Sequence, residues 1–132
     1  MKTLTVQTGS REELKAITRD LSAMVRENRW KNGALLLFCP HTTASLTVNE
    51  AADPDVARDM RSYMGKLVPQ HPDFRHAEGN SDAHIKTSLF GPDLMLIVEN
   101  GQLCLGTWQG VYFCEWDGPR KRALWVQFLP GE

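Results

Sequence analysis

The stretch ALLLFCPHTTASLTVNE, residues 34–50, decides the fold class of this 132-residue chain. Residues 34–39 are continuously apolar, which is typical of a strand covered on both faces. Pro40 interrupts the run, and residues 44–50 then alternate between apolar and polar side chains, as in a half-buried strand. Two strands joined by a polar break, HTT at residues 41–43, therefore form the centre of the expected fold.

The sequence before this centre predicts one strand and one helix. Residues 3–7 alternate as a strand does. Residues 10–13, SREE, match a capping box, in which the Ser10 hydroxyl and the Glu13 carboxylate satisfy free backbone N–H groups. Apolar residues follow at helical spacing, so we expect an amphipathic helix that ends near Asn28.

The sequence after the centre predicts a second amphipathic helix, a long loop and more strands. Asp53 and Pro54 suit the N-cap and first position of a helix that Pro69 ends. Residues 70–93 lack periodicity and are expected to form a loop, which is unusually long for so small a domain. Three strand patterns follow, at residues 94–105 with a turn at Asn100-Gly101, at 111–116 and at 123–129. The chain is thus expected to be a single α+β domain over residues 1–132, ending in an antiparallel β meander.

Composition excludes several classes of function. The 15 basic and 16 acidic residues give a net charge of −1, which argues against nucleic-acid and electrostatic membrane binding. The longest apolar run is too short to span a bilayer, and the N-terminus lacks the apolar stretch of a signal peptide. Three cysteines without a C-x-x-C pair favour a reducing compartment, so we expect a cytoplasmic protein.

The break between the two central strands carries the first candidate site residues. His41 stands beside hydroxyl side chains where the strand is interrupted, and such interruptions often direct side chains into sites. The alternative is a structural histidine in a loop. Asn49 and Glu50 end the second strand, and acidic groups there favour a cation or a metal over a phosphate.

The densest candidate segment is HAEGNSDAHIKTS, residues 76–88. A histidine accepts a proton near neutral pH, and a neighbouring carboxylate can orient it. The same residue types hold divalent metals, although the spacing of His76 and His84 matches no strong metal motif. The alternative interpretation is a solvated polar loop.

The last candidate is GTWQG, residues 106–110. Its glycines indicate a tight bend or a close backbone approach. Trp108 is able to stack on a ring and Gln109 to hydrogen-bond one, whereas the structural alternative packs Trp108 in the core.

Three blocks together, HTTASLTVNE at 41–50, HAEGNSDAHIK at 76–86 and GTWQG at 106–110, resemble the YjbQ family, whose members have been called secondary thiamine-phosphate synthases. The resemblance implies a β-rich α+β fold with antiparallel, sandwich-like sheets and two amphipathic helices, assembled as a homotrimer with pockets near subunit boundaries. It also implies a weak activity that joins hydroxymethylpyrimidine diphosphate to thiazole phosphate. The implied pocket residues are His41, Asn49, Glu50, His76, Asn80, Asp82, His84, Lys86, Ser88, Thr107, Trp108 and Gln109.

The chemistry of these residues suggests separate roles. We expect His84 and Asp82 to be an acid/base pair supported by Glu50 and His76, with the other pocket residues binding a small phosphorylated substrate. A divalent metal, Mg²⁺ or Zn²⁺, is compatible with the donors, with His41, His76 and His84 as candidate ligands, and no organic cofactor is expected. Two other hypotheses remain open: a metal-dependent hydrolase of a small phosphate or amide compound, and a metabolite-binding module without catalysis.

Overall fold

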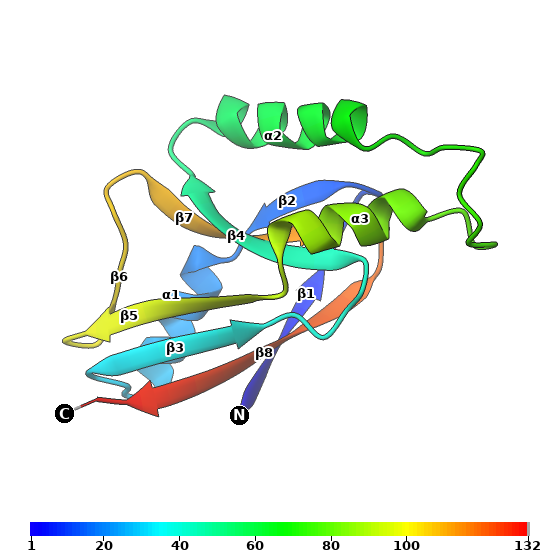
Figure 1. Ribbon diagram of the computed structural model, residues 1–132. Coiled ribbons are helices and arrows are strands. Elements are labelled where there is room, and N and C mark those ends of the chain that lie inside the picture. Colours follow the sequence, from blue (N-terminus) through cyan, green and yellow to red (C-terminus); the bar gives the residue numbers. More distant parts are fainter. Residues whose placement is uncertain (132) are drawn as a thin grey trace.

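The computed structural model describes residues 1–131 and has the α+β architecture that the sequence predicts (Figure 1). Within that range the elements are, in order, β1 (Lys2–Gln7), β2 (Glu13–Ala16), α1 (Thr18–Glu27), β3 (Gly33–Phe38), β4 (Ala44–Glu50), α2 (Pro54–Leu67), α3 (Ser81–Phe90), β5 (Asp93–Glu99), β6 (Gln102–Cys104), β7 (Gln109–Glu115) and β8 (Lys121–Pro130).

The strands form two antiparallel sheets, one in the order β1-β8-β3-β5-β6 and the other in the order β2-β7-β4. The predicted C-terminal meander is wrong, because β5, β6 and β8 join the large sheet whereas β7 joins the small one. The chain crosses between sheets at the 105–108 connection and again at the 116–120 turn. β3 is central: Phe38 lies opposite Asp93 on one side and Trp125 on the other.

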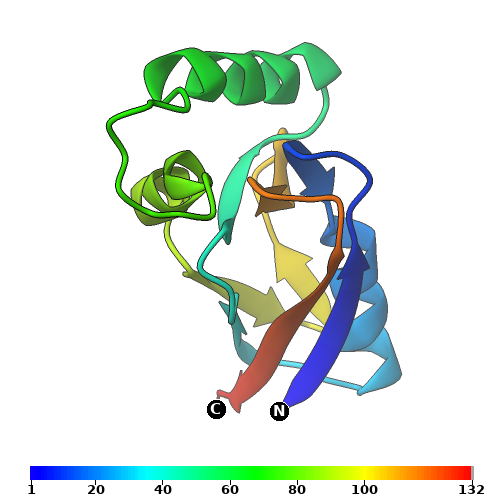
Figure 2. The ribbon, with the colours of Figure 1, turned by 90° about the vertical axis from the view of Figure 1, so that its right-hand side faces the viewer.

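The main core lies between the two sheets and is closed by α1 (Figure 2). Leu35 and Leu37 of β3 are fully buried there with Leu46 of β4, Phe113 of β7 and Val25 of α1. The opposite face of β3 is not covered by residues 1–131, and Phe38 on it is 42% exposed. The expectation that this strand is covered on both faces therefore fails for the single chain.

The first predicted helix starts later than its capping pattern indicates. Residues 13–16 instead form β2, which pairs with β7 from Glu13 opposite Glu115 to Ala16 opposite Tyr112. A carboxylate oxygen of Glu13 accepts the backbone N–H of Gly9, 3.2 Å away, so Glu13 does not cap a helix. Pairing with the free edge of β7 outweighs the local capping signal, and α1 begins at Thr18.

The predicted loop over residues 70–93 is wrong for its second half, which forms α3, the third helix of the described chain. The side of α3 that faces the protein carries Asp82, Lys86 and Thr87 together with Ala83. Because this buried side is mostly polar, the helix has no apolar periodicity for sequence reasoning to detect.

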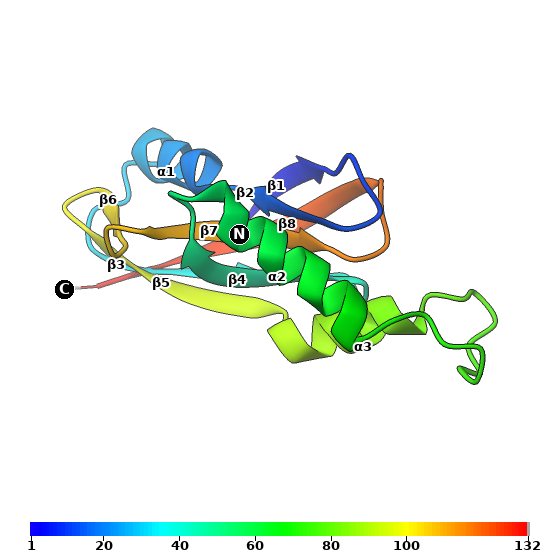
Figure 3. The same ribbon diagram turned by 90° about the horizontal axis from the view of Figure 1, so that it is seen from above.

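Two other local predictions are confirmed. Pro54 is the first residue of α2, and the Asp53 carboxylate accepts the Asp55 backbone N–H at 2.9 Å, as an N-cap does. Asn100 and Gly101 both have positive φ, 52° and 77°, in the turn between β5 and β6. α2 and α3 lie on the outer side of the small sheet, seen from above in Figure 3.

Candidate functional site

The predicted site residues fall into two groups at opposite ends of the molecule, as the views in Figures 1 and 3 agree. One group lies on α3 and the segment before it, with His41 in the connection between β3 and β4. The other lies where β4 ends and β7 begins: Glu50 is paired with Gln109, and Trp108 O accepts the Ala51 N–H at 2.8 Å. A single chain therefore does not bring all the predicted residues together.

His76 and His84 form the centre of the first group. Their ring centroids lie 5.4 Å apart, with the rings nearly perpendicular at 82°. Together with Phe74, Ser81 and Ile85 they line an open pocket of about 450 Å³. A carboxylate oxygen of Glu78 lies 4.0 Å from Nε2 of His76. The pocket thus combines two imidazoles with an apolar wall.

The turn before α3 brings these two histidines together. Gly79 has φ 74° and donates its N–H to His76 O, and Gln70 Nε2 donates to Gly79 O at 3.1 Å. On α3 itself, the Ser88 hydroxyl donates to His84 O at 3.0 Å, so Ser88 serves the helix backbone in this structure. His76 therefore reaches His84 from a loop fixed to the helix start.

Asp82 belongs to a buried ion network and not to the histidine pair. Its carboxylate accepts from Arg11 at 3.1 Å and from Lys86 at 2.9 Å, and Lys86 also binds Glu12 at 2.7 Å. Asp82 and Lys86 side chains are each 1% exposed. Burial acts to raise the pKa of Asp82, but the hydrogen bonds from Arg11 and Lys86 outweigh it and hold that pKa below its ordinary value.

No hydrogen bond or ion pair joins Asp82 to His84 in residues 1–131, although the sequence suggested an acid/base pair. A carboxylate held ionised between two cations is poorly suited to donating a proton at neutral pH. In one chain, Asp82 and Lys86 instead fix α3, while His84 lies on the side of α3 that faces the open pocket.

Sequence reasoning missed two members of this network, Arg11 and Glu12, which lie in the segment that matches a helix cap. It also missed Asp117, the partner of Asn80, between the strands predicted at 111–116 and 123–129. Asn80 donates from Nδ2 to Asp117 at 2.8 Å, and its Oδ1 is buried without a hydrogen-bond partner among the described residues. The spacing of Asp82 and Lys86, four residues apart, was the one signal of an ion pair on a helix.

His41 is held as a neutral imidazole. The backbone N–H of Ala123 donates to its Nε2 at 2.9 Å, so the ring proton resides on Nδ1. Burial lowers the pKa of His41, and the neighbouring Arg122 guanidinium lowers it further. Arg122 in turn forms a buried pair with Glu115 and donates to the Thr43 hydroxyl at 2.9 Å. His41 thus belongs to a packed network beneath β8.

The second group presents an exposed aromatic ring. Trp108 is 64% exposed, so the interpretation that packs it in the core is wrong. Gln109 Oε1 accepts the Gly106 N–H at 2.8 Å and closes the corner that contains Thr107.

The strand ends behind this corner approach closely. A Cβ on Gly110 would lie 2.5 Å from that of Ala51, which explains the glycine there. Asn49 Oδ1 accepts the Glu50 N–H at 2.8 Å, and Tyr112 donates to Glu50 O at 2.9 Å. These bonds fix the backbone of Glu50.

The metal expectation can be tested against the donors of one chain. Among residues 1–131, no three His, Cys, Asp or Glu side chains are arranged to hold a metal ion. His76 and His84 lie together, but Nε2 of His41 is bound to Ala123. The described donors of a single chain therefore do not fit a complete Mg²⁺ or Zn²⁺ site.

No helix in the described range is long and apolar enough to cross a membrane.

Comparison with known proteins finds close similarity over the whole described chain. A family model described as "UPF0047 protein YjbQ-like" matches residues 2–131. The chain is 48% identical to the UPF0047 protein YugU of Bacillus subtilis, over 98% of each chain. It is 44% identical to the UPF0047 protein MJ1081 of Methanocaldococcus jannaschii, over 94% of this chain and 90% of that one.

Solved structures show the same fold. A protein of the yjbq/upf0047 family from Clostridium acetobutylicum, described as uncharacterized, superposes with a TM-score of 0.94 at 45% identity, covering 98% of this chain and 100% of that one. The conserved hypothetical protein TT1486 from Thermus thermophilus gives a TM-score of 0.92, also at 45% identity, with the same coverage.

Proposed function

Because this chain belongs to the YjbQ-like UPF0047 family, we propose that it is a small cytoplasmic enzyme that joins hydroxymethylpyrimidine diphosphate to thiazole phosphate at low efficiency. The observation that carries the proposal is the His76–His84 pair over an open pocket of about 450 Å³. Its three free cysteines support a reducing compartment.

The reaction needs donors around a leaving group. The C–O bond between the pyrimidine methylene carbon and the diphosphate breaks, and the bonding electrons leave with the diphosphate. The thiazole nitrogen gives its lone pair to the same carbon and forms the new C–N bond. Negative charge therefore develops on the diphosphate oxygens, and His76 and His84 are the groups in the pocket that can donate protons to them.

The buried charges beneath the pocket have a different task. Asp82 and Lys86 face into the protein and bind each other, so in this proposal they are positioning residues that hold α3 and thereby His84. Phe74 offers an apolar wall beside the two imidazoles. The proposal thus revises the predicted acid/base pair: His84 acts with His76.

The second group enters the proposal through assembly. We place the exposed ring of Trp108, with Glu50 and Gln109, against the pyrimidine in a site shared between neighbouring copies of a homotrimer. The separation of the two groups on one chain supports a shared site, because a head-to-tail ring brings opposite ends of adjacent copies together.

An apolar surface is present that such an assembly would bury. The outer face of the large sheet exposes side chains from three adjacent strands: Phe38, Met95, Ile97, Trp125 and Leu129. A contiguous apolar surface of this kind marks a protein contact site. The face is therefore our candidate for the contact between copies.

The direct test measures thiamine phosphate formation by purified wild type, His76→Ala and His84→Ala. Loss of a donor to the leaving group is expected to lower the rate about 100-fold. His71→Ala is the matched control, because His71 is exposed in the same segment but does not line the pocket. Equal rates for all four proteins would refute the role of the pair.

A mixing experiment tests whether the site is shared. Trp108→Ala and His84→Ala are each expected to be nearly inactive alone. Unfolded together and refolded as a mixture, they should regain activity, since some sites would then combine an intact Trp108 with an intact His84 from different copies. A mixture no more active than the parents would show that each copy holds its own complete site.

The same preparations separate the alternatives. If wild type contains stoichiometric zinc and His76→Ala and His84→Ala do not, the hypothesis of a metal-assisted hydrolase would replace the synthase hypothesis. Saturable binding of a phosphorylated metabolite without turnover would replace it by a binding module.

A further inference from the structure

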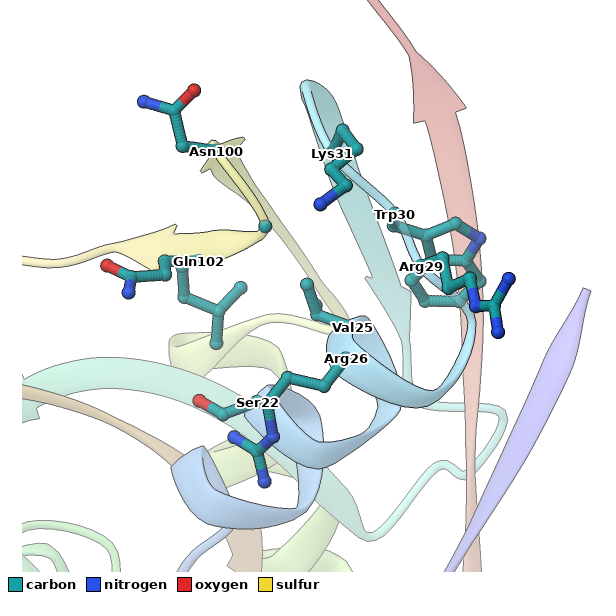
Figure 4. A pocket seen from close by; sticks show the side chains of 10 residues that line it. Ser22, Val25, Arg26, Arg29, Trp30, Lys31, Asn100 and Gln102 are labelled. Carbon is teal, nitrogen blue, oxygen red and sulfur yellow. The ribbon is translucent and has the colours of Figure 1, made fainter.

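A second pocket lies between the C-terminal end of α1 and the hairpin of β5 and β6 (Figure 4). It encloses about 660 Å³ and shares no lining residue with the His76–His84 pocket. Its floor is apolar, formed by the buried Val25 and the half-buried Leu103. A pocket with an apolar floor and a polar rim is a typical small-molecule site.

Backbone hydrogen bonds hold the two walls of this pocket together. Gly101 N–H donates to Lys31 O at 2.9 Å, and Asn100 N–H donates to Oδ1 of Asn32 at 2.9 Å. The hairpin tip is thus tied directly to the segment that follows α1. The pocket is therefore preformed, which reduces the entropy cost of binding a ligand.

The rim carries three cations and no acidic residue: Arg26, Arg29 and Lys31 line it. Within residues 1–131 their side chains make no ion pair and no hydrogen bond. In Figure 4 the ammonium of Lys31 points toward the hairpin, and Arg26 extends along the helix past Ser22. In a chain of net charge −1, this is a local concentration of unpaired positive charge.

Hydrogen bonding at the end of the helix does not use these cations. The carbonyl of Met24 accepts from both the backbone and the side chain of Asn28. The carbonyls of Val25 and Arg26 accept the N–H groups of Trp30 and Arg29. These last carbonyls already have partners, so the three side chains remain available to a ligand.

We propose that this pocket binds a small organic phosphate. The phosphate would lie between the end of α1 and the hairpin, within reach of Arg26 and Lys31, because guanidinium and ammonium groups are the usual partners of phosphate oxygens. Arg29, whose guanidinium lies beyond Trp30 and away from the hairpin in Figure 4, adds to the positive charge of the rim. The organic part would cover the half-buried Leu103, with the Gln102 amide at the rim for its polar atoms. This site is independent of the proposed synthase activity, since its residues belong to neither group of that site.

The test is calorimetric titration of the whole protein with adenosine 5′-monophosphate as the probe and adenosine as the uncharged comparison. The variant Arg26→Gln/Lys31→Gln removes two rim cations. The control Arg19→Gln/Lys66→Gln removes the same charge from exposed positions outside the pocket. Thermal unfolding of each variant verifies the fold.

Adenosine 5′-monophosphate should bind wild type and the control variant with equal affinity. Adenosine should bind wild type at least about tenfold more weakly, and the rim variant should bind the nucleotide at least about tenfold more weakly. Binding should persist in His76→Ala/His84→Ala and weaken as salt is added. The proposal would be overturned if wild type did not bind the nucleotide, or if the control variant lost as much affinity as the rim variant. It would also be overturned if the histidine variant lost affinity while the rim variant bound normally.

Discussion

Lys86 Nζ lies 2.9 Å from a carboxylate oxygen of Asp82, one helical turn earlier on α3, and both side chains are 1% exposed. Two residues of the connection before β2 extend this pair: Arg11 binds Asp82, and Glu12 binds Lys86. A charge network that joins α3 to a distant part of the chain fixes the helix that carries His84. Loss of this network is therefore expected to lower the free energy of unfolding.

Replacing Lys86 by Met should strongly destabilise the protein. It leaves the buried Asp82 with Arg11 as its one remaining partner, and breaking a buried pair typically costs about 3–5 kcal/mol. Urea unfolding measures the change. Arg58→Ala is the control, since it breaks the exposed Arg58–Asp55 pair and should cost about 0.5 kcal/mol or less. Equal losses in the two variants would contradict the structural role of Lys86.

Stability should fall as the solution is acidified below the ordinary carboxylate range. Burial acts to raise the pKa of Glu115, but hydrogen bonds from Arg122 and Thr8 hold it below its ordinary value. The pKa of Asp82 is likewise below its ordinary value. Both groups therefore bind protons more tightly in the unfolded chain, whose pKa values are about 4. Their stabilisation is complete above that value and is lost as pH falls toward the folded pKa values.

Unfolding free energies measured between pH 3 and pH 6 check this expectation. Glu115→Gln should be less stable than wild type at neutral pH, but its free energy of unfolding should fall less on acidification. Glu99→Gln, which removes an exposed carboxylate, should follow the wild-type profile. A Glu115→Gln profile parallel to wild type would show that Glu115 does not contribute to the acid loss.

His41 should titrate below the ordinary histidine range and carry its proton on Nδ1 at pH 7. Nε2 already accepts the Ala123 N–H, and burial and Arg122 both oppose a positive charge on the ring. A ¹⁵N imidazole spectrum measures tautomer and titration, with His41→Gln assigning the signal. A proton on Nε2, or a midpoint above about 6.5, would contradict the geometry.

The elements that sequence could predict are those with local signals. The N-cap and proline that start α2 and the Asn100-Gly101 turn are backbone requirements visible in a few residues. Residues 10–16 show the limit, because SREE satisfies a capping pattern while β7 offers a free edge with which residues 13–16 pair. Such competition between local and long-range bonding cannot be decided from the segment alone.

The site was predicted less completely for two physical reasons. The buried side of α3 is held by ion pairs with Arg11 and Glu12, so apolar spacing does not reveal it, and the spacing of Asp82 and Lys86 is the one local signal. Arg122 lies in the short basic run 120–122, a composition typical of exposed surface, yet it is buried against Glu115. The partners of α3 are distant in sequence, and Arg122 also donates to the hydroxyl of the distant Thr43.

Placing a charge on the outer face of the large sheet should break the proposed homotrimer. Ile97 is 64% exposed on that face, and Ile97→Glu would bury an unpaired carboxylate in the contact. Light scattering coupled to gel filtration should show trimers for wild type and monomers for the variant. Tyr63→Glu, which charges an equally exposed position on α2, is the control. Dissociation by Tyr63→Glu alone would move the contact to another face.

The three cysteines provide a chemical check on both core and surface. Burial raises the pKa of Cys39 to about 11 and that of Cys114 further, so neither should react with a thiol reagent in the native protein.

Cys104 is exposed and lies opposite Ile97 on the outer face of the large sheet. In Ile97→Glu one thiol should react rapidly, and Cys104→Ser in that background should abolish the reaction. In wild type the same thiol should react more slowly if the face is a contact, and all three should react in denaturant. Rapid labelling of Cys39 in the native variant would contradict the packing between the sheets, and rapid labelling of Cys114 would contradict the packing of the small sheet against α3.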